Sequence, residues 1–238
     1  MSLPLPTLPR EGLANGRHES YTFSHMRPWQ ERLWELFSEE LFPLPSSPEL
    51  FNQYRDEDPA FDLPGAAGIR RGNLKNYLMS FYKRPRILLV GEAAGPWGAR
   101  FSGVPFTSER QLQAGALPFA GRKTSNHEPP YSENSGAIVW GALMHYFPEF
   151  FLWNAVPVHP HEKGRPLSIR TPRNSEIKAF CPFLKEALSI ISAGRVAAIG
   201  RKAEYALELI GVPCLYVRHP AQSGAARFRE GIRWLFGD

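Results

Sequence analysis

The sequence has little cysteine and no long apolar run. Its 238 residues include only two cysteines, Cys181 and Cys214, whose placement fits neither a metal-ligand motif nor a disulfide framework. No apolar stretch reaches the roughly 20 residues that a membrane-spanning helix needs. The opening residues, MSLPLPTLPREG, lack the basic and apolar segments of a secretory signal. These absences favour a soluble protein in a reducing, cytoplasmic setting, and we expect no cofactor.

Charge is modest in total but uneven along the chain. The formal net charge is +5. Residues 159–238 hold 13 Lys/Arg against 7 Asp/Glu, whereas the remaining residues hold 15 against 16. A positive second half suits a polyanion such as nucleic acid, although an ordinary solvated basic surface would show the same excess.

The periodicity of apolar residues predicts alternating helices and strands after a Pro- and Gly-rich arm over residues 1–27. We expect the arm to be poorly ordered and residues 28–238 to form one domain. The predicted helices span residues 28–42, 69–82, 135–146, 174–191, 202–210 and 225–236, and the predicted strands span 87–90, 150–157, 196–200 and 214–218. Residues 43–65 and 107–134 read as long loops. The order predicts a three-layer α/β/α fold around a four-stranded, mostly parallel sheet.

The stretch over residues 86–109, RILLVGEAAGPWGARFSGVPFTSE, organises this prediction. Its apolar run is typical of a strand buried on both faces, and the glycine-rich turn after it lets a ligand approach the backbone closely. Ligands of open α/β sheets bind beyond the carboxyl ends of the strands. Glu92, Asn154 and His219 each fall at or just after such an end, so we expect them to meet in one pocket.

Three segments in this order, GEAAGPWGARFSGVPF, WNAVP and RHPAQSG, resemble motifs of the uracil-DNA glycosylase superfamily. The GEAAG turn is similar to the GEAPG-type turn of its iron–sulfur branch. The continuation GPWGARFSGVPF is more similar to the single-strand-selective branch. The resemblance covers about residues 86–234.

The resemblance implies a monofunctional DNA glycosylase of base excision repair that flips a deaminated base, with uracil the first candidate, and hydrolyses its N-glycosidic bond. Glu92 would orient the attacking water, and His219 would stabilise the departing base as negative charge develops on it. Phe106 would stack on the base and Asn154 would hydrogen-bond its Watson–Crick edge. The base-binding backbone would come from Ala93, Ala94 and Gly95.

The chain also departs from the family pattern. Ala93 stands where other branches carry Asp or Asn, so water activation rests on Glu92, and Ala94 replaces the usual proline. Two cysteines cannot hold the four-cysteine iron–sulfur cluster. The segment after His219 normally wedges into the duplex, but here it reads AQSGAARF. We expect DNA contacts from Gln222, Ser223, Arg227, Arg229, Arg201 and Lys202, and a monomeric protein.

Each site residue also has a purely structural interpretation. Glu92 could cap a helix, Asn154 could close a turn, His219 could be a satisfied histidine and Phe106 could be core. We assign Trp97, Trp140 and Trp153 to packing. At the level of function, the alternatives are a glycosylase for another base such as xanthine, hypoxanthine or mismatched thymine, a catalytically silent DNA-binding relative, and a small-molecule α/β enzyme. The last lacks both a G-x-G-x-x-G motif and a P-loop lysine.

Overall fold

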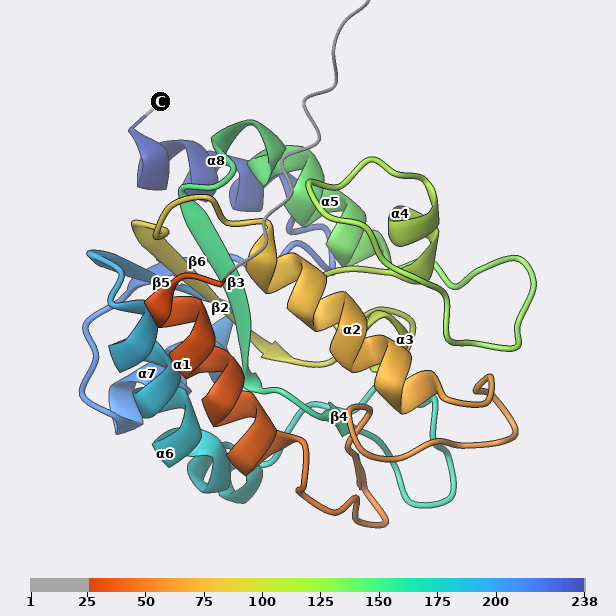
Figure 1. The fold of residues 1–238 in the computed structure, drawn as a ribbon. Coiled ribbons are helices and arrows are strands. Elements are labelled where there is room, and N and C mark those ends of the chain that lie inside the picture. Colours follow the sequence, from red (N-terminus) through yellow and green to blue (C-terminus); the bar gives the residue numbers. More distant parts are fainter. Residues whose placement is uncertain (1–25, 238) are drawn as a thin grey trace, which may run out of the picture.

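The computed structural model describes residues 26–237, which leaves most of the predicted N-terminal arm outside the described residues. Four parallel strands form the central sheet in the order β3-β2-β5-β6 (Figure 1). They span Ile87–Ala93 (β2), Phe150–Val156 (β3), Arg195–Ile199 (β5) and Leu215–Val217 (β6). The α/β/α fold with a four-stranded parallel sheet is therefore confirmed.

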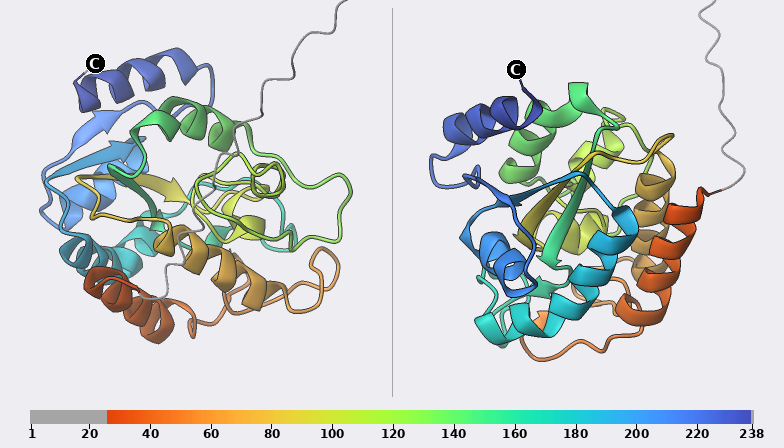
Figure 2. Two further views of the ribbon diagram at one scale, coloured as in Figure 1. Left: turned by 45° about the horizontal axis from the view of Figure 1, so that its top comes forward. Right: turned by 90° about the vertical axis from the view of Figure 1, so that its left-hand side faces the viewer.

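Helices cover both faces of this sheet (Figures 1 and 2). One face carries α1 (Pro28–Leu36), α6 (Asn174–Ile191) and α7 (Arg201–Leu209), and the other carries α5 (Asn134–Leu143) and α8 (Ala225–Phe236). The helix α2 (Ala66–Met79) contributes Tyr77, whose ring packs on Phe151 of β3. None of the helices formed by residues 26–237 is long and apolar enough to cross a membrane.

The apolar runs form strands because both faces of the sheet are covered. All of β3 is buried, and the first five residues of β2 are buried as well. Phe151 and Trp153 point toward α1 and α6, where Trp153 stacks on Phe37 with ring centroids 4.7 Å apart. A strand without an exposed face needs no polar alternation, which explains the continuous apolar pattern in the sequence.

The structure adds short elements that periodicity does not reveal. The first predicted helix continues past α1 as a π-helical turn, Phe37–Leu41. A small antiparallel pair joins β1 (Leu50–Phe51) to β4 (His159–Pro160), so the predicted loop at residues 43–65 contains a strand. Helices α3 (Ala99–Ser102) and α4 (Glu109–Gln113) and the single turn Met144–Tyr146 complete the described elements.

The long polar stretch at residues 107–134 folds against the body of the protein. Thr107, Ser108 and Glu109 are buried, and so are Thr124 and Ser125. The Glu109 carboxylate accepts hydrogen bonds from the backbone N–H groups of Thr124 and Ser125 at 2.6 and 2.8 Å. One buried acid therefore ties the two ends of this stretch together, which a polar sequence pattern cannot reveal.

Candidate active site

The register of the sheet brings the predicted site residues to one edge. Gly91 of β2 lies directly opposite Asn154 of β3, and Ile199 of β5 lies opposite Val217 of β6. Glu92 follows Gly91, and His219 comes two residues after Val217. Because all four strands are parallel, their carboxyl ends meet at this edge of the sheet.

Phe106 and Asn154 close tightly around Gly91. A Cβ atom on Gly91 would lie 2.3 Å from Phe106 Cζ and 2.6 Å from Asn154 Oδ1, so only glycine fits there. Phe106 adopts a left-handed backbone conformation with φ at +53°. A bulky residue in that region signals strain that the surrounding structure imposes. The strain presents the Phe106 ring to the end of β2.

Asn154 is only 3% exposed, and its side-chain amide makes no hydrogen bond to the rest of residues 26–237. The amide is not one of the fully buried polar atoms without a partner, so it keeps a small contact with solvent. A polar group with solvent access can bind water in the free protein and exchange that water for a ligand. Gly91 and Phe106 flank this amide. An unpaired amide beside an aromatic ring has the chemistry to recognise a planar, hydrogen-bonding ligand.

His219 lies beside Phe106. Their ring centroids are 6.5 Å apart. His219 Nδ1 accepts a hydrogen bond from the backbone N–H of Ala221 at 3.2 Å. Burial, and secondarily the charge of Arg218, lowers the pKa of His219, so the ring is neutral at pH 7. A neutral ring that accepts at Nδ1 carries its proton on Nε2, where it is available to donate.

Glu92 supplies a carboxylate at the same edge. Burial raises its pKa, whereas a hydrogen bond from the Thr171 side chain and the charge of Lys202 act in the opposite direction. Lys202 also hydrogen-bonds Asn174 Oδ1 at 2.9 Å. In its ionised form, a partly buried carboxylate can accept a proton from water. No motif surrounds Thr171, so its effect on Glu92 could not be predicted from the sequence.

The turn after β2, which contains Gly95 and Gly98, packs against a second acidic residue, Glu133. The sequence patterns did not indicate this residue. A Cβ atom on Gly95 would lie 2.1 Å from Glu133 Oε1, and one on Gly98 would lie 2.3 Å from Oε2. Burial raises the pKa of Glu133 to about 7, against a hydrogen bond from Ser135 that lowers it. Only its position directly before α5, at the end of a long loop, could have drawn attention to Glu133.

The remaining predicted base-binding positions offer backbone rather than side chains. Ala93 is half-buried and Ala94 is buried. The carbonyl oxygen of Ala94 is 2.9 Å from His159 Nδ1. His159 Nε2 is in turn 3.1 Å from the carbonyl oxygen of Pro166. Burial lowers the pKa of His159 to about 4, so the ring is neutral and its single N–H donates to one of these two carbonyl oxygens. The buried ring nevertheless lies between the glycine turn and the loop after β4.

Neither His159 nor His161 belongs to a metal cluster in the described part of the chain, where no three His, Cys, Asp or Glu side chains come together to hold an ion. Trp140 and Trp153 are buried as expected. The assignment of Trp97 to packing is wrong, because its side chain is 39% exposed on the glycine turn. The turn needs glycines at 95 and 98 to accommodate Glu133. Of the two residues between them, Pro96 is buried and Trp97 is exposed.

The predicted DNA-contacting residues differ in whether their side chains already form ion pairs within the protein. Gln222 and Ser223 are exposed and both have positive φ, at +52° and +61°. Arg227 and Arg229 are exposed and form no ion pair within residues 26–237. Arg201, by contrast, pairs with Glu204 at 2.6 Å and covers the Tyr216 ring. The unpaired cations therefore lie at the start of α8, close in sequence to His219.

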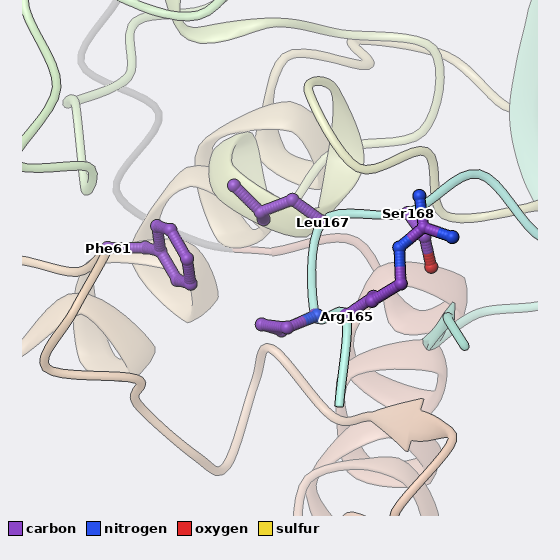
Figure 3. A pocket seen from close by; sticks show the side chains of 5 residues that line it. Phe61, Arg165, Leu167 and Ser168 are labelled. Atoms are coloured by element: carbon purple, nitrogen blue, oxygen red, sulfur yellow. The ribbon is translucent and has the colours of Figure 1, made fainter. Parts of the chain in front are cut away.

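An open pocket of about 360 Å³ lies elsewhere, between Phe61 and the loop at residues 165–168 (Figure 3). Pro166 lines it, and the carbonyl oxygen of the same residue meets His159. The pocket contains none of Glu92, Phe106, Asn154 and His219, which form the strand-end site.

Comparison with known proteins identifies the family of the chain. The family model described as the uracil DNA glycosylase superfamily matches residues 79–235. The chain belongs to this superfamily. The matched range begins in α2 and takes in every strand of the central sheet and each residue of the strand-end site. Membership of the superfamily makes the chain a DNA glycosylase by family, and DNA is the substrate on which that family acts.

A solved structure shows the same fold. Wild-type SMUG2 of Pedobacter heparinus superimposes with a TM-score of 0.59, over 88% of this chain and 99% of that chain. The two sequences are 13% identical, so the likeness concerns architecture alone. No curated protein sequence matches the chain.

Proposed function

We propose that this glycosylase removes a deaminated base, uracil first, from DNA in base excision repair, by hydrolysis and without a lyase step. The observation that supports the proposal is the position of the Phe106 ring, which lies close to Gly91 and Asn154 and has its centroid 6.5 Å from that of His219. Glu92 is the next residue after Gly91 in β2, so its carboxylate comes from the same end of the sheet.

A base extruded from the helix would stack on Phe106 and pair through its Watson–Crick edge with the Asn154 amide. An amide offers both a donor and an acceptor, which matches the adjacent N–H and C=O groups of uracil. The amide makes no hydrogen bond to the rest of residues 26–237, so it can pair with the base in place of water.

Hydrolysis breaks the bond between C1′ of the deoxyribose and the base nitrogen, and the electron pair leaves with the base. The Nε2–H of His219 would donate a hydrogen bond to the base oxygen on which negative charge develops. Glu92 would take a proton from the water whose oxygen bonds to C1′. Ala93 has no polar side chain, so within this proposal Glu92 is the general base that activates the water.

The proposal extends to the setting of the enzyme. Cys181 and Cys214 are free thiols, which suits a reducing, cytoplasmic compartment. Arg227, Arg229, Gln222 and Ser223 would meet the DNA strand around His219, and Lys202 and Arg201 would add positive potential. We propose that a monomer suffices, because the four groups of the site come from one chain.

The test is cleavage of labelled oligonucleotides that carry uracil, hypoxanthine or xanthine, as single strands and as duplexes. Strand breaks should appear only after alkali, and borohydride should trap no enzyme–DNA adduct. Glu92→Gln, Asn154→Ala and His219→Ala should each lose activity. The exposed Glu186→Gln on α6 is the matched control and should retain it. Retained DNA binding with no cleavage of any substrate would instead identify a silent binding relative.

A further inference from the structure

Ile169 is the most exposed of the large hydrophobic side chains in residues 26–237, at 71%. Single exposed apolar residues are common on protein surfaces and need no explanation by themselves. Ile169 differs because the residues around it are fixed and because it lies next to the proposed active site.

The loop that carries Ile169 is anchored on both sides. Before it, Ser168 Oγ accepts a hydrogen bond from the backbone N–H of Glu162 at 2.7 Å. After it, the Arg170 guanidinium donates to the carbonyl oxygens of His161 and Glu49, at 2.9 and 2.8 Å, and to the Glu176 carboxylate. Hydrogen bonds on both sides of Ile169 therefore fix the backbone that exposes its apolar side chain to solvent. Such a fixed, exposed side chain suggests a role in binding.

Two contacts place this loop along the glycine turn. The Thr171 side chain lies close enough to Glu92 to lower the pKa of its carboxyl group. On the other side of Ile169, the carbonyl oxygen of Pro166 meets His159, whose second ring nitrogen meets the carbonyl oxygen of Ala94. In the sequence, Ile169 thus lies between Thr171, which approaches Glu92 near the end of β2, and Pro166, which His159 links to Ala94 directly after β2. An extruded base would leave its gap in the DNA beside this turn.

The segment after His219 has little to fill such a gap. Its exposed residues are Ala221, Gln222 and Ser223, and their side chains are short or polar. An apolar wedge inserted between base steps offsets the lost stacking, and branched aliphatic side chains are among those that proteins use for this purpose. A surface that binds DNA also needs cationic side chains that contact phosphates. Lys163 in the same loop is exposed and forms no ion pair within residues 26–237, so it is available for such a contact.

We propose that Ile169 is the apolar wedge that enters the duplex beside the extruded nucleotide, and that its partner is therefore double-stranded DNA. The proposal rests on the proposed glycosylase function but goes beyond it, because it assigns base extrusion to the loop between β4 and α6. A single strand has no neighbouring stack to open, so Ile169 should matter chiefly on duplexes.

The test compares Ile169→Ala, Ile169→Leu and the control Leu209→Ala, whose side chain is 42% exposed at the end of α7. Each variant is assayed on the same uracil-containing strand, alone and in a duplex. In Ile169→Ala the ratio of duplex to single-strand activity should fall by about tenfold, because the apolar filler is lost. Ile169→Leu and Leu209→Ala should keep the wild-type ratio. An unchanged ratio in Ile169→Ala would overturn the proposal, and so would a wild-type enzyme that cuts only single strands.

A second measurement separates the wedge from the glycosylase activity. If the wild type cuts neither substrate, the proposed function fails, and binding then decides the role of Ile169. The probe is a duplex with one tetrahydrofuran abasic analogue, compared with the intact duplex. The wild type should prefer the abasic duplex and Ile169→Ala should lose that preference. Equal preference in both proteins would refute the wedge.

Discussion

The rings of Phe106 and His219 face the same space with centroids 6.5 Å apart and planes inclined at 39°. The tilt prevents a parallel sandwich, so a base stacked on Phe106 would meet His219 at its edge. That geometry gives the two rings separate tasks: Phe106 offers a face for stacking, and His219 offers a hydrogen bond from Nε2.

Removal of the Phe106 ring should therefore weaken binding of the base without unfolding the protein. Stacking of a base on an aromatic side chain is worth about 1–3 kcal/mol, so Phe106→Leu should lower kcat/KM on single-stranded substrate by roughly ten- to a hundredfold. Leucine keeps most of the apolar contact, and the melting temperature of the variant should stay close to that of the wild type. Loss of both activity and melting temperature would mean that Phe106 is chiefly a core residue.

Gly91→Ala should disable the site from within. The new Cβ would lie 2.3 Å from Phe106 Cζ and 2.6 Å from Asn154 Oδ1, so both base-binding groups must move. Displacement of a positioning group by about 1 Å can cost on the order of a hundredfold in rate, and we expect at least that loss in kcat/KM. Gly141→Ala in α5 is the control, because no atom lies within 4 Å of the added Cβ. A Gly91→Ala enzyme of wild-type activity would place the base elsewhere.

Glu92 should set the acid limb of the pH–rate profile. Its pKa is raised by burial, and the ionised form is the one that accepts a proton, so activity should fall as the pH drops through this raised pKa. The charge of Lys202 lowers the pKa of Glu92. Lys202→Met should therefore move the acid limb to higher pH, whereas Lys202→Arg should leave it near the wild-type position. A limb that does not move in Lys202→Met would show that another group controls it.

The fold could be predicted from the sequence because continuous apolar runs indicate which strands are buried on both faces. Strands buried on both faces read as β2 and β3 do, and α6 and α8 begin and end where periodicity predicts. Parallel strands then bring Glu92, Asn154 and His219 to one edge without any knowledge of contacts. Glu133 and Thr171 were not predicted as site residues, because their roles depend on neighbours that are distant in the sequence. The exposed positions of Trp97 and Ile169 likewise depend on how the surrounding turns are held.

Glu133 gives the last prediction, which concerns stability and its pH dependence. Burial raises the pKa of its carboxyl group to about 7, so the folded protein binds this proton more tightly than the unfolded chain does. The contribution to stability is fully present below the unfolded pKa and is lost as the pH rises through about 7. Above that pH, ionised Glu133 should cost the fold on the order of 3 kcal/mol.

Glu133→Gln removes the charge and keeps the shape of the side chain against Gly95 and Gly98. The variant should therefore gain free energy of unfolding relative to the wild type at pH 8 but not at pH 5, measured by urea denaturation at both pH values. The exposed Glu186→Gln should show no such difference. An equal change at pH 5 and pH 8 would mean that Glu133 is ionised throughout, and that a partner for its carboxylate stabilises the glycine turn at every pH.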